Sequence, residues 1–381
     1  MRIAILTLPL HTNYGGIIQN YALQTILERM GHDVCTININ EPKAKMPLIK
    51  APLYITKRLI KKIMDREDGI ILIERKINRD KIIIEQHVRR FINDNIHLTQ
   101  PYYTKKDLLE FDKENFDAVI VGSDQVWRIA YAYPDIETYF LDFVKNKQTK
   151  KIAYSASFGT DEAKFSDEQI KTCGKLIKKF EVISVREQGA IQLINNIYKW
   201  ECKTKPVHTL DPTMLLSNED YIKISDQYAH KNHNGELFYY ILDMTDEKRE
   251  LLQKISSDLG LKPFTVSPKS NNKLGKAEAR IVPPIEEWLQ AFNQASFVLT
   301  DSFHGTVFSI IFNKDFITIG NKNRGMGRFY SLINQFNLQD RFITSNDEYK
   351  EQTKKTINWN SINMILEQER KFSFELLKQI K

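Results

Sequence analysis

The chain has 381 residues, of which 42% are hydrophobic and 27% charged, a composition typical of folded globular proteins. This length suits two domains better than one. The three cysteines, Cys35, Cys173 and Cys202, are far apart and have no metal-ligand spacing, so they indicate a reducing, cytoplasmic setting rather than a disulfide framework. The first apolar stretch is too short for a signal peptide, and none approaches the roughly 20 residues that span a bilayer.

The net charge of +7 can be interpreted in several ways. A basic protein attracts anionic substrates, nucleic acid or an anionic membrane surface, although a basic surface with no partner is about as common. The sequence has no zinc-finger spacing, basic zipper or RNP-like aromatic signature. We therefore predict no nucleic-acid partner.

The first elements along the chain predict a βαβ unit. Residues 2–8 are rich in Ile and Leu, as in a buried parallel strand. Apolar residues then follow helical spacing over 17–30, and Gly31 stands where a helix ends. Residues 34–39 form the next predicted strand. This order is typical of doubly wound α/β folds.

A basic helical insert is predicted at about residues 53–95. Three prolines mark a loop before it, and pairs of Lys and Arg then punctuate a long helical pattern over 57–90. One alternative is a solvated helix face, which is the commoner case. The other is an amphipathic segment that rests peripherally on the inner face of a membrane.

Further strands predict two α/β halves. The first half continues with strands at 119–121, 151–155 and 182–185, and residues 208–213 cross to the second half. The second half has strands at 238–242, 262–266, 297–300 and 316–319, with a helix at 285–293. We expect domains at 1–207 and 208–345, and helices at 346–381 that pack back on the first domain.

Three polar, glycine-containing breaks follow short apolar runs and point to a ligand site. They are residues 13–16, 122–125 and 300–306. Open α/β sheets bind ligands outside the carboxyl ends of their strands, where such breaks lie. We interpret the chain as an enzyme on this basis.

The break at 300–306 places His304 at the predicted start of a helix. Imidazole can donate or accept a proton near pH 7, and a helix N-terminus attracts anions. Gly305 lets the backbone approach a ligand closely. The alternative is a capping or core histidine, but we favour a catalytic role in so polar a break.

Three arginines suit an anionic ligand. Arg186 ends a strand, and Arg324 and Arg328 lie in a loop after the strand that ends at 319. Guanidinium groups bind phosphate and carboxylate bidentately. Each could instead form a surface salt bridge.

The two remaining breaks suit a sugar. Asn13, Tyr14, Gly15 and Gln19 match neither the dinucleotide pattern nor a P-loop, so their polar groups are predicted to bind sugar hydroxyls. The alternative for this segment is a tight strand-to-helix turn.

The segment 122–127 combines Ser123, Asp124 and Gln125 with the indole of Trp127, a common way to hold a sugar. Asp124 could also act as a general base. Core packing is an equal alternative for Trp127. We interpret Asp211-Pro212 mainly as a structural turn.

Together these segments resemble the polysaccharide pyruvyl transferase family. They are NYGGIIQNYALQ (13–24), DAVIVGSDQVW (117–127), SVRE (184–187), LDPT (210–213), TDSFHGTVFSII (300–311) and RGMGRF (324–329). They stand in the family's order and cover roughly residues 1–340. As a set they are specific, although each alone is weak.

The resemblance implies an α/β fold of two Rossmann-like domains that face each other across a cleft, as in GT-B glycosyltransferases. It implies phosphoenolpyruvate as donor, a sugar of a surface polysaccharide as acceptor, and a cyclic pyruvate ketal and phosphate as products. No metal or nicotinamide cofactor is needed. His304 matches the histidine that protonates the donor, and Arg186 matches a donor-binding arginine. Asp124 is the candidate base or acceptor ligand.

One position departs from the family. Characterised members carry a donor-binding arginine two residues before the histidine, where this chain has Ser302. Either Lys322, Arg324 or Arg328 supplies that charge, or the donor differs. Two other functions stay open: a GT-B glycosyltransferase that uses a nucleotide sugar, and a non-catalytic module that binds carbohydrate or anions.

Overall fold

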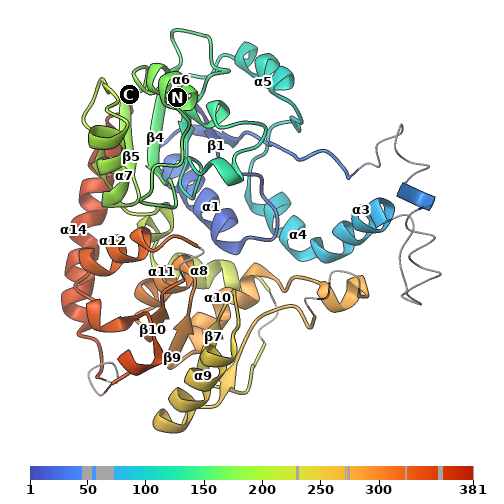
Figure 1. The fold of residues 1–381 in the computed structure, drawn as a ribbon, viewed down its shortest axis with the longest axis vertical. Helices are drawn as coiled ribbons and strands as arrows, with labels where there is room; N and C mark the ends of the chain where they lie inside the picture. The colour runs from blue at the N-terminus through green and yellow to red at the C-terminus, as the bar shows by residue number, and fades with distance from the viewer. Residues whose placement is uncertain are drawn as a thin grey trace.

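The structure is a computed structural model that describes residues 1–44, 54–56, 73–228, 231–270, 272, 275–321, 324–350 and 355–380. Its core is two parallel β-sheets, one above the other in Figure 1, each flanked by helices. The expected α/β fold with two Rossmann-like domains is confirmed.

The first sheet has the strand order β2-β1-β3-β4-β5-β6. Alternate residues of its central strands enter opposite cores, because successive side chains of a strand point to opposite faces. Ile3 and Ile5 pack on the side of α1, and Ala4 and Leu6 pack on the side of α5 and α6. The strands are β1 (Arg2–Leu6), β2 (Asp33–Thr36), β3 (Ala118–Val121), β4 (Lys150–Ala156), β5 (Val182–Val185) and β6 (Val207–His208).

The second sheet has the order β11-β10-β9-β7-β8. Phe238 and Val298 face α10 and α11, whereas Leu237 and Leu299 face α9. The strands are β7 (Leu237–Tyr240), β8 (Pro263–Phe264), β9 (Phe297–Thr300), β10 (Asp315–Ile319) and β11 (Phe342–Ile343). The predicted strands are present in both sheets, but β6 and β11 are only two residues long and were missed.

Helices cover both faces of each sheet. None of the described helices has the length and hydropathy needed to cross a bilayer. They are α1 (Tyr14–Arg29), α3 (Ile73–Ile84), α4 (Gln86–Asn95), α5 (Lys105–Phe111), α6 (Asp167–Ile177), α7 (Gln188–Gln192), α8 (Asn218–Ser225), α9 (Asp246–Leu259), α10 (Ile285–Gln294), α11 (Phe303–Ile311), α12 (Gly327–Gln335) and α14 (Trp359–Lys378).

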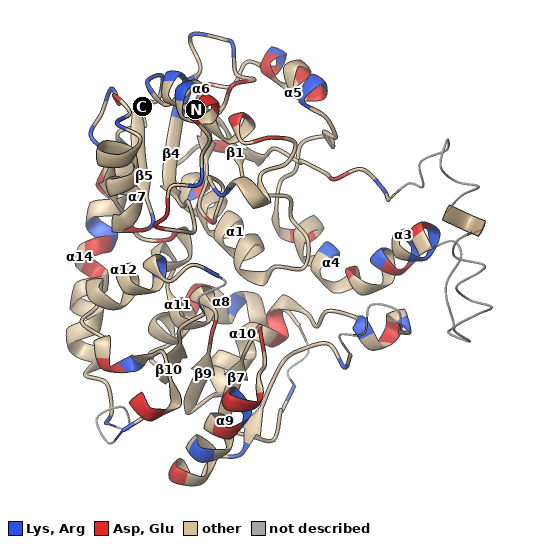
Figure 2. Ribbon diagram, viewed as in Figure 1, with Lys and Arg blue, Asp and Glu red and all other residues tan. Residues whose placement is uncertain are grey.

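The helical insert of the first half is present as α3 and α4. Helix α3 extends away from the body and carries charges of both signs (Figure 2). The insert also touches the second half, because the Val282 amide donates to the Ile84 carbonyl at 3.0 Å and Arg90 pairs with Glu286 at 2.6 Å. Residues 57–72 of the predicted membrane segment lie outside the described residues.

The C-terminal helix packs against the segment that joins the two halves, whereas the sequence predicted packing on the first domain. Helix α14 begins after the N-cap Asn358 and runs along one side of the molecule (Figure 1). Arg370 donates to the carbonyls of Met214 and Leu216, each at 2.6 Å, and the Leu210 amide donates to Ser373 Oγ at 3.4 Å. The helix therefore ties the second half to the crossing segment.

Candidate active site

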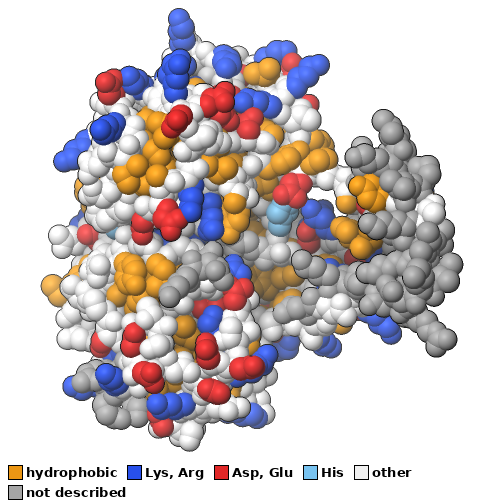
Figure 3. All heavy atoms as spheres, in the orientation of Figure 1, with side chains coloured by type: hydrophobic (Ala, Val, Ile, Leu, Met, Phe, Trp, Pro, Cys, Tyr) orange, Lys and Arg blue, Asp and Glu red, His pale blue; other side chains and the backbone are white. Residues whose placement is uncertain are grey.

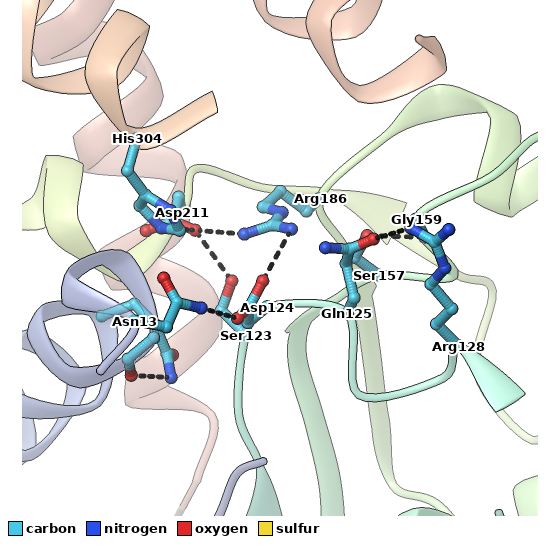
Figure 4. Close-up of polar contacts among 12 residues, drawn as sticks. Asn13, Ser123, Asp124, Gln125, Arg128, Ser157, Gly159, Arg186, Asp211 and His304 are labelled. Carbon is cyan, nitrogen blue, oxygen red and sulfur yellow. Dashed lines mark hydrogen bonds and ion pairs between the residues drawn. The ribbon is translucent and has the colours of Figure 1, made fainter. Parts of the chain in front are cut away.

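Polar side chains from both halves meet in one buried group where the strands of the first sheet end. We call Asn13, Asp124, Arg186, Asp211 and His304 the central cluster (Figure 4). The first four follow β1, β3, β5 and β6, and His304 begins α11 of the second half. All except Asn13 are buried. Parallel strands bring their carboxyl ends to one edge, which explains this convergence.

Asp211 is the hub of the cluster. Its Oδ2 accepts from Ser123 Oγ at 2.9 Å and Arg186 Nη1 at 3.0 Å, and lies 3.6 Å from His304 Nε2. Thr213 donates to Oδ1. Burial opposes ionisation of Asp211, but His304, Arg186 and Thr213 together outweigh burial and hold its pKa well below the usual range. The carboxylate is therefore anionic.

His304 is held between the two halves. A Cβ on Gly15 would lie 2.0 Å from His304 Nδ1, so the imidazole rests directly on the first turn of α1. Its buried Nε2 has no hydrogen-bond partner among the described residues, because 3.6 Å to Asp211 is an ion-pair distance. This nitrogen is thus available to a ligand.

Ser302 and Gly305, which lie close to this histidine in the sequence, have structural roles in helix α11. Ser302 is the N-cap of α11, and its Oγ accepts from the Gly305 amide at 3.3 Å. A Cβ on Gly305 would lie 2.1 Å from Thr300 Oγ1, so glycine permits the helix to pack closely on β9. The structure thus gives Ser302 and Gly305 local structural roles, and their predicted part in donor binding stays a prediction.

Arg186 is buried between two carboxylates and an aromatic ring. Its Nη1 donates to Asp211, its Nη2 lies 3.4 Å from Asp124, and its guanidinium lies 4.4 Å from the centre of the Phe303 ring. Its Nε has no hydrogen-bond partner among the described residues. Arg186 is therefore held in place, and its Nε remains available to donate a hydrogen bond to a ligand.

Of the two described cations among those proposed to replace the missing arginine, Arg328 lies beside the Phe303 ring and Arg324 does not. The Arg328 guanidinium is 5.4 Å from the Phe303 ring, and its buried Nε has no hydrogen-bond partner among the residues described. Burial and the nearby charge of Arg186 lower the pKa of Arg328 to about 10. In contrast, Arg324 forms a two-pronged bond to Asp243 at 2.6 and 3.0 Å. Lys322 lies outside the described residues.

The residues of the first break that were predicted to bind the acceptor do not all reach the central cluster. Asn13 reaches the cluster, since its Nδ2 donates to Asp124 Oδ2 at 3.3 Å. Gln19 is buried and donates to Thr7, and the Tyr14 hydroxyl donates to the Pro283 carbonyl at 2.6 Å. Gln19 and Tyr14 thus hold the turn and the contact between the halves.

The second break turns sharply at Asp124, whose φ of 68° is in the left-handed region. Gln125 accepts from Arg128 Nη1 at 2.6 Å. Trp127 has no exposed surface, stacks on Phe140 and donates from Nε1 to the Tyr139 carbonyl. Core packing, one of its two predicted roles, describes its position, and its ring has no free face for a sugar.

A hollow of about 460 Å³ lies beside this break. It is lined by the segment after Trp127, by the loop that follows β4, and by Gly325 of the second half. A Cβ on Gly325 would lie 2.0 Å from the Gly159 carbonyl, so the two halves touch at its edge. Trp127, a predicted site residue, also lines this hollow, whereas the lining residues that follow Trp127 or β4 were not predicted because they lie outside the recognised motifs.

Two acidic residues were also missed as parts of the site. Asp211 follows a two-residue strand, so its place at the sheet edge is hidden in the sequence. Glu187 accepts from Ser157 Oγ and the Phe158 amide, each at 2.9 Å, and thereby holds the loop after β4. Both lie in segments that carried the family resemblance.

The site can therefore bind a small polyanion and move a proton. Two buried guanidinium groups offer Nε donors, and an imidazole beside an anionic carboxylate can hold a proton. No side chain of the cluster is free to supply a nucleophile for a covalent intermediate of the serine or cysteine type.

Solved structures with a similar fold include a glycosyltransferase and an epimerase. A glycosyltransferase from Rickettsia africae ESF-5 is 13% identical with a TM-score of 0.51, and the match covers 99% of each chain. The UDP-GlcNAc 2-epimerase from Neisseria meningitidis, bound to UDP-GlcNAc, is 9% identical with a TM-score of 0.51 and complete coverage of both chains. At these identities the likeness concerns the fold alone.

The sequence itself gives the family. None of the curated proteins compared with the chain matches it. The family model described as polysaccharide pyruvyl transferase matches residues 13–323, which include every member of the central cluster. The chain belongs to the polysaccharide pyruvyl transferase family.

Proposed function

We propose that the protein transfers a pyruvyl group from phosphoenolpyruvate to a sugar of a surface polysaccharide or its precursor. The observation that supports this most is the pair of buried guanidinium groups, Arg186 and Arg328, on the Phe303 ring beside His304. Phosphoenolpyruvate carries a phosphate and a carboxylate on three carbons. Two guanidinium groups close together suit these two anions.

In this reaction His304 gives its proton to the methylene carbon of the donor, which makes C2 an electrophile. A sugar hydroxyl attacks C2, the bond from C2 to the phosphate oxygen breaks, and a second hydroxyl of the same sugar closes the ketal. One hydroxyl proton returns to His304, and the other is taken by a base, for which Asp124 is the candidate, and leaves with phosphate. Anionic Asp211, 3.6 Å from Nε2, stabilises the imidazolium between these steps.

Asp124 is the proposed base or acceptor ligand. It is tied to Asn13 at 3.3 Å and to Arg186 at 3.4 Å, so it links the predicted acceptor side to the donor side. The 460 Å³ hollow next to Gln125 offers the reacting sugar an approach. We place the reaction in the cytoplasm, with an acceptor that can be lipid-linked, and without a cofactor.

Isotope transfer tests this proposal. Wild-type protein is incubated in D2O with ¹³C-labelled phosphoenolpyruvate and envelope glycans of cells that express the chain. A labelled ketal whose methyl group carries one deuterium supports the mechanism, and His304→Gln should reduce its formation at least about 100-fold while phosphoenolpyruvate still binds. Sugar transfer from a nucleotide sugar instead would indicate a glycosyltransferase. Undiminished function in His304→Gln would indicate a binding module.

A further inference from the structure

A second hollow, of about 920 Å³, lies apart from the central cluster. It is formed by α7 and β6 of the first half and by α12 and α14, which lie together at one side of the molecule (Figure 1). Its volume is in the range of sites that bind small molecules. Two aromatic rings at this hollow, those of Tyr330 and Phe372, are each 46% exposed. We call it the side groove.

The side groove is rich in uncharged hydrogen-bonding groups. The side-chain amides of Gln188, Asn334, Gln335 and Gln368 line it, as do the hydroxyls of Tyr330 and Ser331. Amides both donate and accept, as sugar hydroxyls do. The exposed faces of Tyr330 and Phe372 can stack on the C–H faces of a sugar ring, which is the usual apolar contact in such sites.

The groove differs in charge from the rest of the molecule. The chain has 55 Lys and Arg residues and a net charge of +7, yet no Lys or Arg is among the described residues that line this groove. Its charged lining residues are the carboxylates Asp161 and Glu369. An anionic ligand would meet only negative charge there, so a neutral ligand is favoured.

The groove shares its wall with the central cluster. Gln188 follows Glu187 directly, and Gly327 directly precedes Arg328. His208, which lines the groove, lies with Nε2 2.9 Å from the Arg186 carbonyl. The backbone that carries Arg186 and Arg328 therefore lies between the side groove and the central cluster. A glycan in the groove would lie next to the reacting site without entering it.

We propose that the side groove binds a neutral stretch of the acceptor glycan, so that the polysaccharide is held at a second place while one of its sugars reacts. The aromatic rings contact the sugar faces and the amides bind the hydroxyls. This inference rests on the proposed function for the identity of the glycan as acceptor. The fit of the lining residues to a neutral sugar does not depend on the proposed function.

Binding of defined oligosaccharides tests the inference. Neutral oligosaccharides of two to four glucose, galactose, mannose or N-acetylglucosamine units are titrated by saturation-transfer NMR, with uronate-containing oligosaccharides as the anionic arm. The variants are Phe372→Ala and Gln368→Ala, both at exposed positions. The matched control is Met364→Ala, which is 75% exposed on the same helix and does not line the groove. Thermal melting checks that all four proteins fold.

We expect at least one neutral oligosaccharide to bind, with a loss of about tenfold or more in each groove variant and none in the control. Absence of neutral binding, a preference for the uronates, or binding that both groove variants retain would overturn the inference. Phosphoenolpyruvate is titrated in parallel and should bind equally to all four proteins. If only phosphoenolpyruvate fails to bind, the proposed function fails and the neutral-glycan site stands.

Discussion

The contact between Gly15 and His304 makes one glycine essential to the site. A methyl group at residue 15 would collide with the imidazole at 2.0 Å. We expect Gly15→Ala to displace His304 and to lower pyruvyl transfer about 100-fold, because displacements near 1 Å can have that effect. The control is Gly122→Ala, whose Cβ meets nothing closer than 3.4 Å. Equal activity of both variants would contradict this contact.

Asp211 gives the protein a defined response to acid. Its folded pKa lies below the unfolded value of about 3.9. The ionised carboxylate therefore stabilises the fold fully above about pH 4, and this contribution is lost as the pH falls toward the folded pKa. We expect Asp211→Asn to lower the free energy of unfolding by about 3–5 kcal/mol at pH 7, since it leaves Arg186 partly unpaired.

Chemical denaturation from pH 7 to pH 3 measures this effect. The asparagine variant should also lose less stability on acidification than the wild type. Asp94→Asn is the control, because the exposed Asp94 lies 3.7 Å from Arg90 on the surface of α4 and should contribute less than about 1 kcal/mol. A loss no greater than that of the control would show that Asp211 is not the hub of the cluster.

Sequence patterns identified most residues of the central cluster, but not which side chains each candidate residue would contact. His304, Arg186, Asp124 and Asn13 meet as the breaks after the apolar runs predicted. The choice among three candidate cations was not decided by sequence, because Asp243, which neutralises Arg324, lies 81 residues away. Asp211 was interpreted as a turn because its contacts come from segments that only the folded sheet edge brings together.

Helix α11 explains the serine that replaces the family arginine. Ser302 caps the helix, a role that an arginine side chain cannot perform because it has no acceptor. We expect Ser302→Ala to lower stability by about 1 kcal/mol. The variant should change phosphoenolpyruvate affinity less than about threefold. Calorimetry and denaturation of the same samples would measure both. A tenfold loss of affinity would instead make Ser302 a donor ligand.

Long, patterned elements were predictable, whereas two of the three two-residue strands were not. The βαβ unit at the N-terminus and the strand that precedes His304 have clear apolar runs. In contrast, β6 and β11 have two residues each and gain their strand character only from their neighbours. The position of Trp127 was also not predictable from the sequence, because a single residue does not reveal on which face of the sheet its side chain packs.

The protruding helix α3 bears on where the protein acts. Ile77 and Ile82 are 49% and 65% exposed, and the exposed Arg75 and Arg79 stand on the same helix. We propose peripheral binding to an anionic membrane through this insert. Each basic residue near such a surface contributes about 1 kcal/mol. Arg75→Glu with Arg79→Glu should therefore reduce co-sedimentation with phosphatidylglycerol vesicles at least tenfold at low salt.

The control for this experiment is Lys171→Glu with Lys175→Glu, an equal charge change on the exposed face of α6. We expect the control to bind vesicles nearly as the wild type does. Equal losses in both variants would mean that only net charge matters, and equal binding to neutral vesicles would remove the proposed membrane role of α3.

The two halves bring the donor-side arginines together across their contact, since Arg186 belongs to the first and Arg328 to the second. Calorimetric titration of phosphoenolpyruvate into wild type and Arg328→Gln, with a nucleotide sugar titrated in parallel, tests this most directly. We predict that phosphoenolpyruvate binds the wild type, that the variant binds it at least about tenfold more weakly, and that the nucleotide sugar binds neither. Tighter binding of the nucleotide sugar, or phosphoenolpyruvate binding that is absent or independent of Arg328, would contradict the account.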